Sequence, residues 1–466
     1  MSVGVLYNKI TIGKKAQGGE IMAKEFRKNS DNIFERFIAG LDDSINSGEK
    51  LKDADRDLQY SLHLQNERIK RHGLTAKFDY SVRGNQADGF NLGNKWRDGH
   101  YINTVEIRSM GQQEEFFKDG KKLFKYKERS KIQQTMTGVT SYEDVAEDEY
   151  ICPDCGTPSK IKNLIDGCPS CGNKFKMSEL YPKISNYHIE PDFAYTYGEM
   201  FGKTILPAMG ITVGVLLLLD IIASLLIALL GGLGMCAGSA WGDSSVTFNS
   251  MQILGTALSM FFMMGIMAIF GGAFFGWIIG TIIVLIRFAI LSSKKLSAVP
   301  YLGTIKQFEE FMKKISPEYS YFFFSGKVMS MVKMLLLSDN PTELPFYNGK
   351  PINPAYKDIV EVASRGVVGL VDIKTEGDYV FCTSDVFLTD TYYRGGKVSR
   401  IDEVVRVVMK KNVNKPVNMR FQITGIHCPN CGGSFDATKN KTCPYCGGSY
   451  KIEDEDWSIE WLDRRP

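Results

Sequence analysis

Eight of the ten cysteines form four Cys-x-x-Cys pairs, and their spacing is that of metal ligands. The first two pairs read CPDCG and CPSCG with twelve residues between them, and the last two read CPNCGG and CPYCGG with eleven between them. Two residues between cysteines let both sulfurs face one metal ion, and two such pairs complete a tetrahedral site. The expected zinc ligands are Cys152, Cys155, Cys168, Cys171, Cys428, Cys431, Cys443 and Cys446.

The two four-cysteine sites are expected to hold structural zinc ions. Four sulfurs leave no open coordination position for a substrate or a water molecule. The alternative is a redox dithiol, but that chemistry needs only one pair with an exposed thiol of low pKa. Zinc thiolates need a reducing compartment, which favours a cytoplasmic location for both ribbons. Cys236 and Cys382 stand alone and are expected to be packing residues.

A block almost free of charged residues lies between the two ribbons. Its first segment, 204–230, carries one charge, Asp220, and about 20 apolar residues suffice to cross a bilayer core. Its second segment, within 251–291, is about twice the length needed, so it holds one long span or two spans broken at Gly271 and Gly272. We therefore expect two or three membrane crossings.

The basic residues beside the block favour two crossings. Lys203 precedes the first segment and Arg287, Lys294 and Lys295 end the second, whereas the loop 231–250 contains neither lysine nor arginine. The positive-inside rule places both flanks in the cytoplasm. Zinc thiolates on both sides of the block also require an even number of crossings. The expected location is the cell membrane, multi-pass, with both termini and both ribbons cytoplasmic.

Asp220 is the one ionisable residue within the first span. Such residues are costly in a bilayer and tend to mark ion or proton paths, which suggests a transporter or channel component. The alternative is a polar packing contact inside the helix pair, or a position nearer the interface. The sequence shows no transporter-like repeat, which favours an anchor.

The region before the block reads as a small α+β domain. Apolar residues from Ile33 to Ile45 follow helical spacing, with Asp31 or Asn32 expected to cap the helix at its start. Alternating apolar and polar residues then predict strands at 75–82, 102–108 and 123–127.

The order of an α+β domain followed by a ribbon occurs again after the block. Apolar positions from Phe324 to Leu336 predict a helix, and β-branched runs predict an antiparallel meander of strands at 366–374, 379–392 and 397–411. The alternation around Trp457 predicts a last strand after the second ribbon.

The expected fold is that of an α+β membrane protein with two soluble α+β domains, two zinc ribbons and an α-helical transmembrane block. Its predicted segments are a soluble domain (1–150), zinc ribbon 1 (151–175), a linker (176–203), the transmembrane block (204–292), a juxtamembrane linker (293–318), a second α+β domain (319–427), zinc ribbon 2 (428–450) and a terminal strand of that domain (451–466).

Composition and missing motifs argue against two functional classes. The chain has 56 Lys plus Arg and 53 Asp plus Glu, and the loops of the ribbons carry few lysines and no interleaved aromatic residues, unlike a nucleic-acid-binding protein. It contains no GxxxxGK, HExxH or GxSxG motif, and its five histidines are scattered. We therefore expect a protein that is not an enzyme.

Residues from about Tyr319 to Leu462 resemble the domain named after subunit 44 of the mitochondrial inner-membrane translocase. The resemblance rests on the segments FFFSGKVMSMVKMLLLSDN, GVVGLVDIK, YVFCTSDVFLTD and IDEVVRVVMKK, and on the inserted cysteine pairs followed by EDWSIEWL. Bacterial members of that family similarly attach membrane spans and zinc ribbons. The resemblance implies the cone-shaped fold of nuclear transport factor 2, with a pocket for peptide or lipid, and a membrane-side platform in protein transport that contacts anionic lipid.

Together these features favour a membrane-anchored zinc-ribbon scaffold or adaptor. Its expected partners are membrane lipids and a protein that the sequence does not identify, bound at the cytoplasmic face. The alternative is a small transporter or channel component that uses Asp220.

Overall fold

The computed structural model describes residues 20–82, 95–191, 201–240, 250–296 and 302–465. It is a mixed α and β structure with two larger antiparallel sheets and two long apolar helices. The chain divides into two compact units, one of Met1–Asp192 with Ala298–Pro466 and the other of Phe193–Ser297. We call the first the soluble unit and the second the hairpin unit. Each is described by itself below.

The first sheet of the soluble unit has the order β1-β3-β4-β7, with β2 beside β3. Its strands are β1 (Leu74–Val82), β2 (Lys95–Asp98), β3 (Tyr101–Lys118), β4 (Lys121–Val139) and β7 (Lys183–Pro191). A tight turn joins β3 to β4, and both of its residues, Asp119 and Gly120, have positive φ, as a right-handed twisted hairpin requires. Strands β3 and β4 extend well beyond the expected 102–108 and 123–127.

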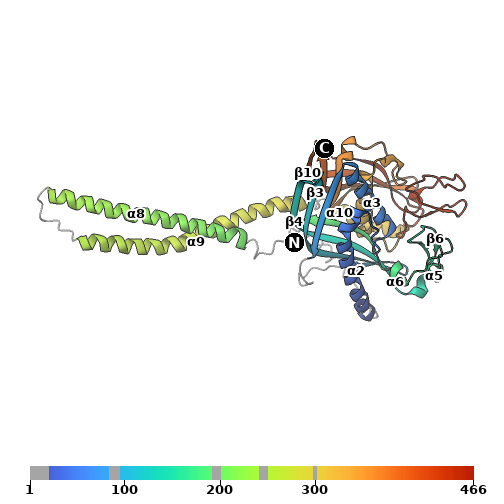
Figure 1. Ribbon diagram of the computed structural model, residues 1–466, viewed down its shortest axis with the longest axis horizontal. Coiled ribbons are helices and arrows are strands. Elements are labelled where there is room, and N and C mark those ends of the chain that lie inside the picture. Colours follow the sequence, from blue (N-terminus) through green and yellow to red (C-terminus); the bar gives the residue numbers. More distant parts are fainter. Residues whose placement is uncertain (1–19, 83–94, 192–200, 241–249, 297–301, 466) are drawn as a thin grey trace. The chain divides into compact units, whose positions relative to one another are not determined.

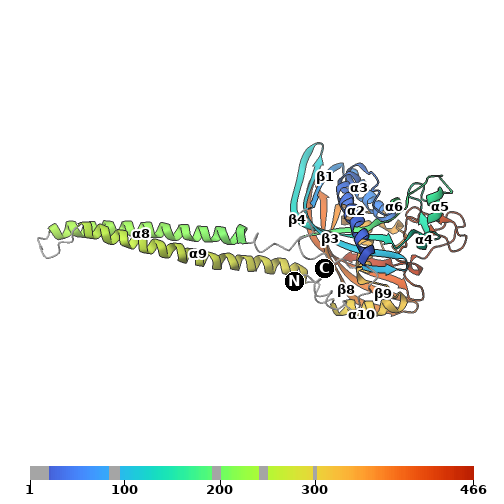
Figure 2. The same cartoon turned by 90° about the horizontal axis from the view of Figure 1, so that it is seen from below.

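Two helices pack on this sheet, α2 (Glu20–Ser47) and α3 (Arg56–Arg71), as Figure 2 shows. The predicted apolar face is present, because Ile33, Phe34, Phe37, Ile38, Leu41 and Ile45 are all buried. The predicted start was wrong, because α2 begins at Glu20 and residues 31 and 32 lie inside it. Apolar spacing locates the buried face of a helix but does not locate its first turn.

The second sheet has the order β13-β10-β9-β8 and is antiparallel throughout. Its strands are β8 (Ile359–Glu376), β9 (Tyr379–Arg394), β10 (Lys397–Asn412) and β13 (Ser458–Arg464), and the helices α10 (Leu302–Ile315) and α11 (Tyr321–Leu337) pack against it. The expected helix and meander are both present. Strand β13 pairs with β10 after the second ribbon, so that ribbon is inserted before the last strand as expected.

Shorter elements surround the ribbons and connect the sheets. They are α4 (Tyr142–Val145), β5 (Glu149–Ile151), β6 (Pro158–Lys160), α5 (Ile161–Asp166), α6 (Met177–Leu180), β11 (Ile426–His427), β12 (Ser434–Phe435), and the 3-10 helices η3 (Pro341–Glu343), η4 (Pro354–Asp358) and η5 (Ile452–Asp454).

Two segments expected to be linkers each contribute an element to the soluble unit. Residues 176–203 contain β7, which completes the first sheet beside β4. Residues 293–318 contain α10, whose Phe308 and Met312 are fully buried in the main core. A register shift in β7 breaks its apolar alternation, so the strand is hard to see in the sequence.

The regions before and after the apolar block are joined by buried polar contacts. The Arg68 guanidinium in α3 donates to the carbonyls of Leu337, Ser338 and Tyr356 at 2.9 Å each. Arg400 in β10 pairs with the buried Glu114 in β3 at 3.1 Å. One compact unit therefore stands where the sequence analysis placed two domains.

The hairpin unit consists of a π-helical turn, η1 (Phe201–Ile205), and two helices, α8 (Leu206–Ala240) and α9 (Ser250–Leu296), which lie side by side (Figures 1 and 2). Two stretches, Gly202–Leu230 and Leu258–Ile286, are long and apolar enough to cross a membrane. In an 18-residue apolar window of each stretch, only 6% and 17% of the residues are buried, unlike the core helix of a soluble protein. Helix α9 runs unbroken through Gly271 and Gly272.

Candidate metal centres and a polar cavity

The eight predicted zinc ligands form two tight four-sulfur clusters. In the first, the sulfurs of Cys152 and Cys171 lie 3.8 Å apart and those of Cys155 and Cys168 lie 3.7 Å apart. In the second, the Cys428–Cys446 and Cys431–Cys443 sulfur distances are both 3.6 Å. Four thiolates at the usual 2.3 Å from a tetrahedral zinc would be roughly 3.8 Å apart. The geometry of both clusters therefore suits one zinc-sized metal ion each.

A backbone turn around each cysteine pair positions its two sulfurs. In every pair the glycine after the second cysteine donates its amide to the carbonyl of the first cysteine, at 2.8–3.0 Å. These four glycines, Gly156, Gly172, Gly432 and Gly447, have φ between 71° and 77°, a conformation that other residues rarely adopt. The CPxCG pattern is thus a local determinant of the clusters, and it explains why sequence spacing alone identified all eight residues.

The two ribbons lie next to one another in the soluble unit. The His427 imidazole, just before the second ribbon, is 2.7 Å from the carboxylate of Glu149, just before the first. Gly425 packs directly on the Ile151 side chain. His427 is therefore not a metal ligand but part of the contact between ribbons, which sequence spacing could not reveal.

The isolated Cys382 is fully buried in the main core, whereas the side chain of Cys236 lies outside the described residues.

Asp220 lies at the contact between α8 and α9 and is only 3% exposed. It faces Gly265 of α9, where an added Cβ would lie 3.3 Å from the carboxylate. Within the described residues neither carboxylate oxygen has a hydrogen-bond partner, and the same holds for the Ser224 hydroxyl one turn further along α8. The hairpin thus buries a polar group without satisfying it.

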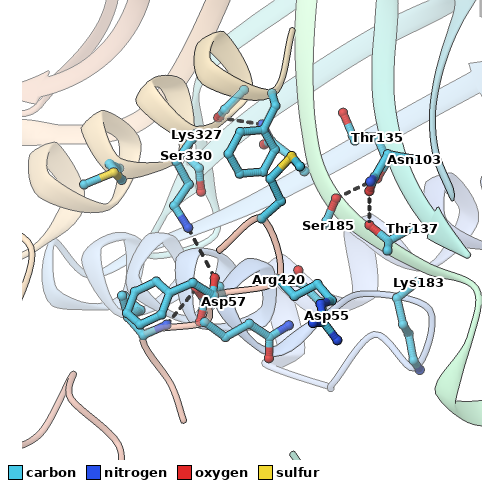
Figure 3. Close-up of a pocket in the computed structure, with 18 of the residues that line it drawn as sticks. Asp55, Asp57, Asn103, Thr135, Thr137, Lys183, Ser185, Lys327, Ser330 and Arg420 are labelled. Atoms are coloured by element: carbon cyan, nitrogen blue, oxygen red, sulfur yellow. Dashed lines mark hydrogen bonds between the residues drawn. The ribbon is translucent and has the colours of Figure 1, made fainter. Parts of the chain in front are cut away.

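A cavity of about 120 Å³ lies between the two regions of the soluble unit (Figure 3). Its walls come from the start of α3, from β3, β4 and β7, from α11, and from the segment 419–423. The charged and amide side chains that line it include Asp55, Asp57, Asn103, Lys183, Lys327 and Arg420. Its apolar wall includes Phe322, Phe323, Met331, Phe346, Phe421 and Trp457.

Buried carboxylates give this cavity its electrostatic character. Burial, and then the charge of Asp57, raise the pKa of Asp55 to about 8. Burial also raises the pKa of Asp57, whereas the charge of Lys327 opposes that rise. Burial lowers the pKa of Lys327, but the carboxylates of Asp456 and Asp57 outweigh it and the net change is upward. The cavity is therefore a desolvated site in which ionic charge is costly unless it is paired.

No sequence pattern predicts this cavity. The D-A-D run that begins at Asp53 is typical of a helix cap. Asp55 does cap α3, because its side chain accepts a hydrogen bond from the Leu58 amide at 2.8 Å. The other walls lie about 50 to 400 residues away in the sequence, so no local pattern could assemble them.

Comparisons with protein-family models, with curated proteins and with solved structures found no match. The function is therefore argued from the geometry of this chain.

Proposed function

We propose that this protein is a membrane-anchored zinc scaffold that binds a protein partner through its ribbons. The observation that carries the proposal is the single soluble unit built from residues on both sides of the apolar block. Two parts of one folded body cannot lie on opposite sides of a bilayer. The block must then cross the membrane an even number of times, as a hairpin of α8 and α9.

The cytoplasmic face is the proposed location of the soluble unit. Thiolate clusters keep their metal in a reducing compartment, and both clusters belong to this unit. The basic residues beside the block favour the same side. A role in protein transport, and contact with anionic lipid, remain part of this proposal through the resemblance of 319–462 to the subunit 44 family.

The second ribbon offers a preorganised contact surface for a partner. Tyr445, between the two cysteines of the last pair, is 71% exposed, more than any other large apolar side chain described in the soluble unit. Its ring lies against Gly433, where an added Cβ would come within 2.6 Å of it. Exposed tyrosines held in place are common anchors of protein interfaces because little side-chain entropy is lost on binding.

Crosslinking in intact cells tests this proposal directly. Partners crosslinked to the full-length protein would be identified by mass spectrometry and compared with those of Tyr445→Ala and of the control Tyr142→Ala, whose ring is 36% exposed elsewhere on the unit. A partner lost with Tyr445→Ala and kept with Tyr142→Ala supports the scaffold. Identical partner sets for all three proteins would contradict the role of the second ribbon.

A second candidate function rests on Asp220, whose buried carboxylate has no partner in the described part of the hairpin. In a transporter or channel component such a group would bind a proton or a cation in passage. Asp220→Asn keeps the shape of the side chain and removes its charge. Loss of cellular function in this variant, with unchanged partner crosslinking and unchanged abundance, would favour transport over scaffolding.

A further inference from the structure

The cavity between the two regions of the soluble unit contains three cationic side chains, and each has a partner of its own. The Lys327 ammonium is 2.6 Å from the buried carboxylate of Asp456. Arg420 pairs with Asp148 at 3.1 Å, and the Lys183 ammonium donates to the carbonyl of Lys52. Carboxylates thus balance Lys327 and Arg420, whereas Lys183 is hydrogen-bonded to a neutral carbonyl.

The two carboxyl groups of the cavity, Asp55 and Asp57, differ in the number of hydrogen bonds that they accept. Asp57 accepts three hydrogen bonds, from the amides of Ile423 at 3.0 Å and Thr424 at 3.1 Å and from the Thr424 hydroxyl at 2.8 Å. Asp55 accepts only from the Leu58 amide at 2.8 Å, and within the described residues it forms no ion pair. It is partly buried and lines the cavity, where Figure 3 labels it. Asp55 is therefore the carboxyl group with fewer hydrogen-bond donors, and a bound cation would favour its ionised form.

The hydroxyl groups on the opposite wall also favour a hydrogen-bond donor as ligand. The Thr137 hydroxyl donates to the Asn103 side-chain oxygen at 2.7 Å, and the Ser185 hydroxyl donates to the Thr135 carbonyl at 3.3 Å. Each has used its only hydrogen, so its remaining lone pairs can only accept. A ligand that presents N–H groups can therefore donate to these hydroxyl oxygens.

We propose that this cavity is a binding site for a small organic ammonium ion, with the Asp55 carboxylate as its counter-ion. The apolar part of the ligand would lie against Phe322, Phe323 and Met331 of α11. A cavity of roughly 150 Å³ holds a benzene molecule, so the 120 Å³ found here suits a ligand of about six non-hydrogen atoms or fewer. The proposal concerns a site separate from the ribbon surface and does not depend on the scaffold function.

Calorimetric titration of the full-length, zinc-loaded protein in detergent tests the site with n-butylammonium as probe. Uncharged n-butanol and anionic butyrate are controls of nearly the same size. A difference in affinity among the three probes therefore reports the effect of charge and not of shape. We expect n-butylammonium to bind roughly tenfold or more tightly than either, because a hydrogen bond between two charged groups is stronger than one between neutral groups. Equal binding of the three probes, or no binding of n-butylammonium, would overturn the proposal.

Asp55→Asn is the variant that isolates the counter-ion. Asparagine keeps the side-chain oxygen that caps α3, so the helix start is preserved while the charge is removed. We expect n-butylammonium to bind at least about tenfold more weakly to this variant. Asp119→Asn, at the exposed β3–β4 turn, is the matched control and should bind as the parent does. Unchanged affinity in Asp55→Asn, with both zinc ions retained, would rule out Asp55 as the counter-ion.

Discussion

Asp55 has two opposite effects on the stability of the folded protein. As a helix cap it stabilises α3 through the Leu58 amide, typically by about 1 kcal/mol. As a desolvated carboxylate beside Asp57 it resists ionisation, and Lys327 and Lys183 offset this only in part. A partly buried group that lowers the stability of the empty protein is consistent with a ligand site, because a ligand can supply the missing partner.

This conflict predicts how stability depends on pH. The pKa of Asp55 is raised from 3.8 to about 8, so the folded protein keeps a proton there that the unfolded chain releases, and stability falls as pH rises between these values. Asp55→Asn has no proton to lose. The melting temperature of this variant should therefore rise relative to that of the parent from about pH 4 to about pH 8, and the difference should then stay constant. Parallel curves for the two proteins would show that Asp55 ionises normally.

Each cysteine cluster should hold one zinc ion independently of the other. Cys155→Ser and Cys431→Ser each remove one ligand from a different four-sulfur cluster. Metal analysis of the purified protein should fall from two zinc ions per chain to one in each variant. Cys382→Ser, which alters a buried cysteine outside both clusters, should keep both ions. Full zinc content in either ligand variant would contradict the assignment.

At the scale of elements, glycines of α9 set the distance between the two hairpin helices. Three glycines spaced four residues apart contact three residues spaced four apart in η1 and α8. The pairs are Gly272 with Val213, Gly276 with Met209, and Gly280 with Ile205. A Cβ added to Gly272 would lie 2.7 Å from the Val213 Cα, and one added to Gly280 would lie 2.8 Å from the Ile205 Cα. Small residues at such spacing let helix backbones approach closely in a membrane.

Gly276→Ala should therefore separate the helices. Its Cβ would meet the Thr212 hydroxyl, the Met209 Cα and, at 2.8 Å, the Ala208 carbonyl oxygen, so the backbone has to shift. We expect the hairpin to lose about 1–3 kcal/mol of stability, measured as denaturant unfolding in detergent. Gly271→Ala, whose Cβ would have nothing within 4 Å, should be neutral. Equal effects of the two substitutions would mean that the helices do not pack through this face.

The elements that could be predicted from the sequence are those determined by residues close together in the chain. The cysteine clusters follow from a turn of a few residues, the apolar helices from composition, and the buried face of α2 from its spacing. The extension of β3 was missed because Gln112 and Glu114 are buried polar residues, which break the apolar alternation of a strand. The cavity was missed because Asp55, Asn103 and Lys327 meet only through long-range packing.

At the scale of the whole molecule, Arg68 is a buried link between the two regions of the soluble unit. It is 1% exposed and binds the last carbonyls of α11, where the helix dipole favours a cation. A planar guanidinium can serve several carbonyls at once, whereas a lysine ammonium cannot match that geometry. The joining of the regions thus depends on a residue that, in sequence, belongs to an ordinary amphipathic helix.

Arg68→Lys should loosen the soluble unit while keeping the charge. We expect a loss of about 2–4 kcal/mol in unfolding free energy because buried carbonyls lose their donors. Arg71→Lys is the control, since Arg71 is 56% exposed where it pairs with Asp339, and it should change stability by less than about 1 kcal/mol. Similar losses in both variants would argue that the buried contacts of Arg68 add nothing.

The central claim is that residues on both sides of the hairpin unit form one body on one side of a membrane. The most direct test places an epitope tag in the exposed β3–β4 turn at Gly120, in the β9–β10 turn at Gly395 and, separately, in the segment 241–249. Antibody labelling is then compared in intact and permeabilised cells. The account predicts that both turn tags are labelled only after permeabilisation, whereas the tag in 241–249 is labelled in intact cells. Turn tags on opposite sides of the membrane would contradict it.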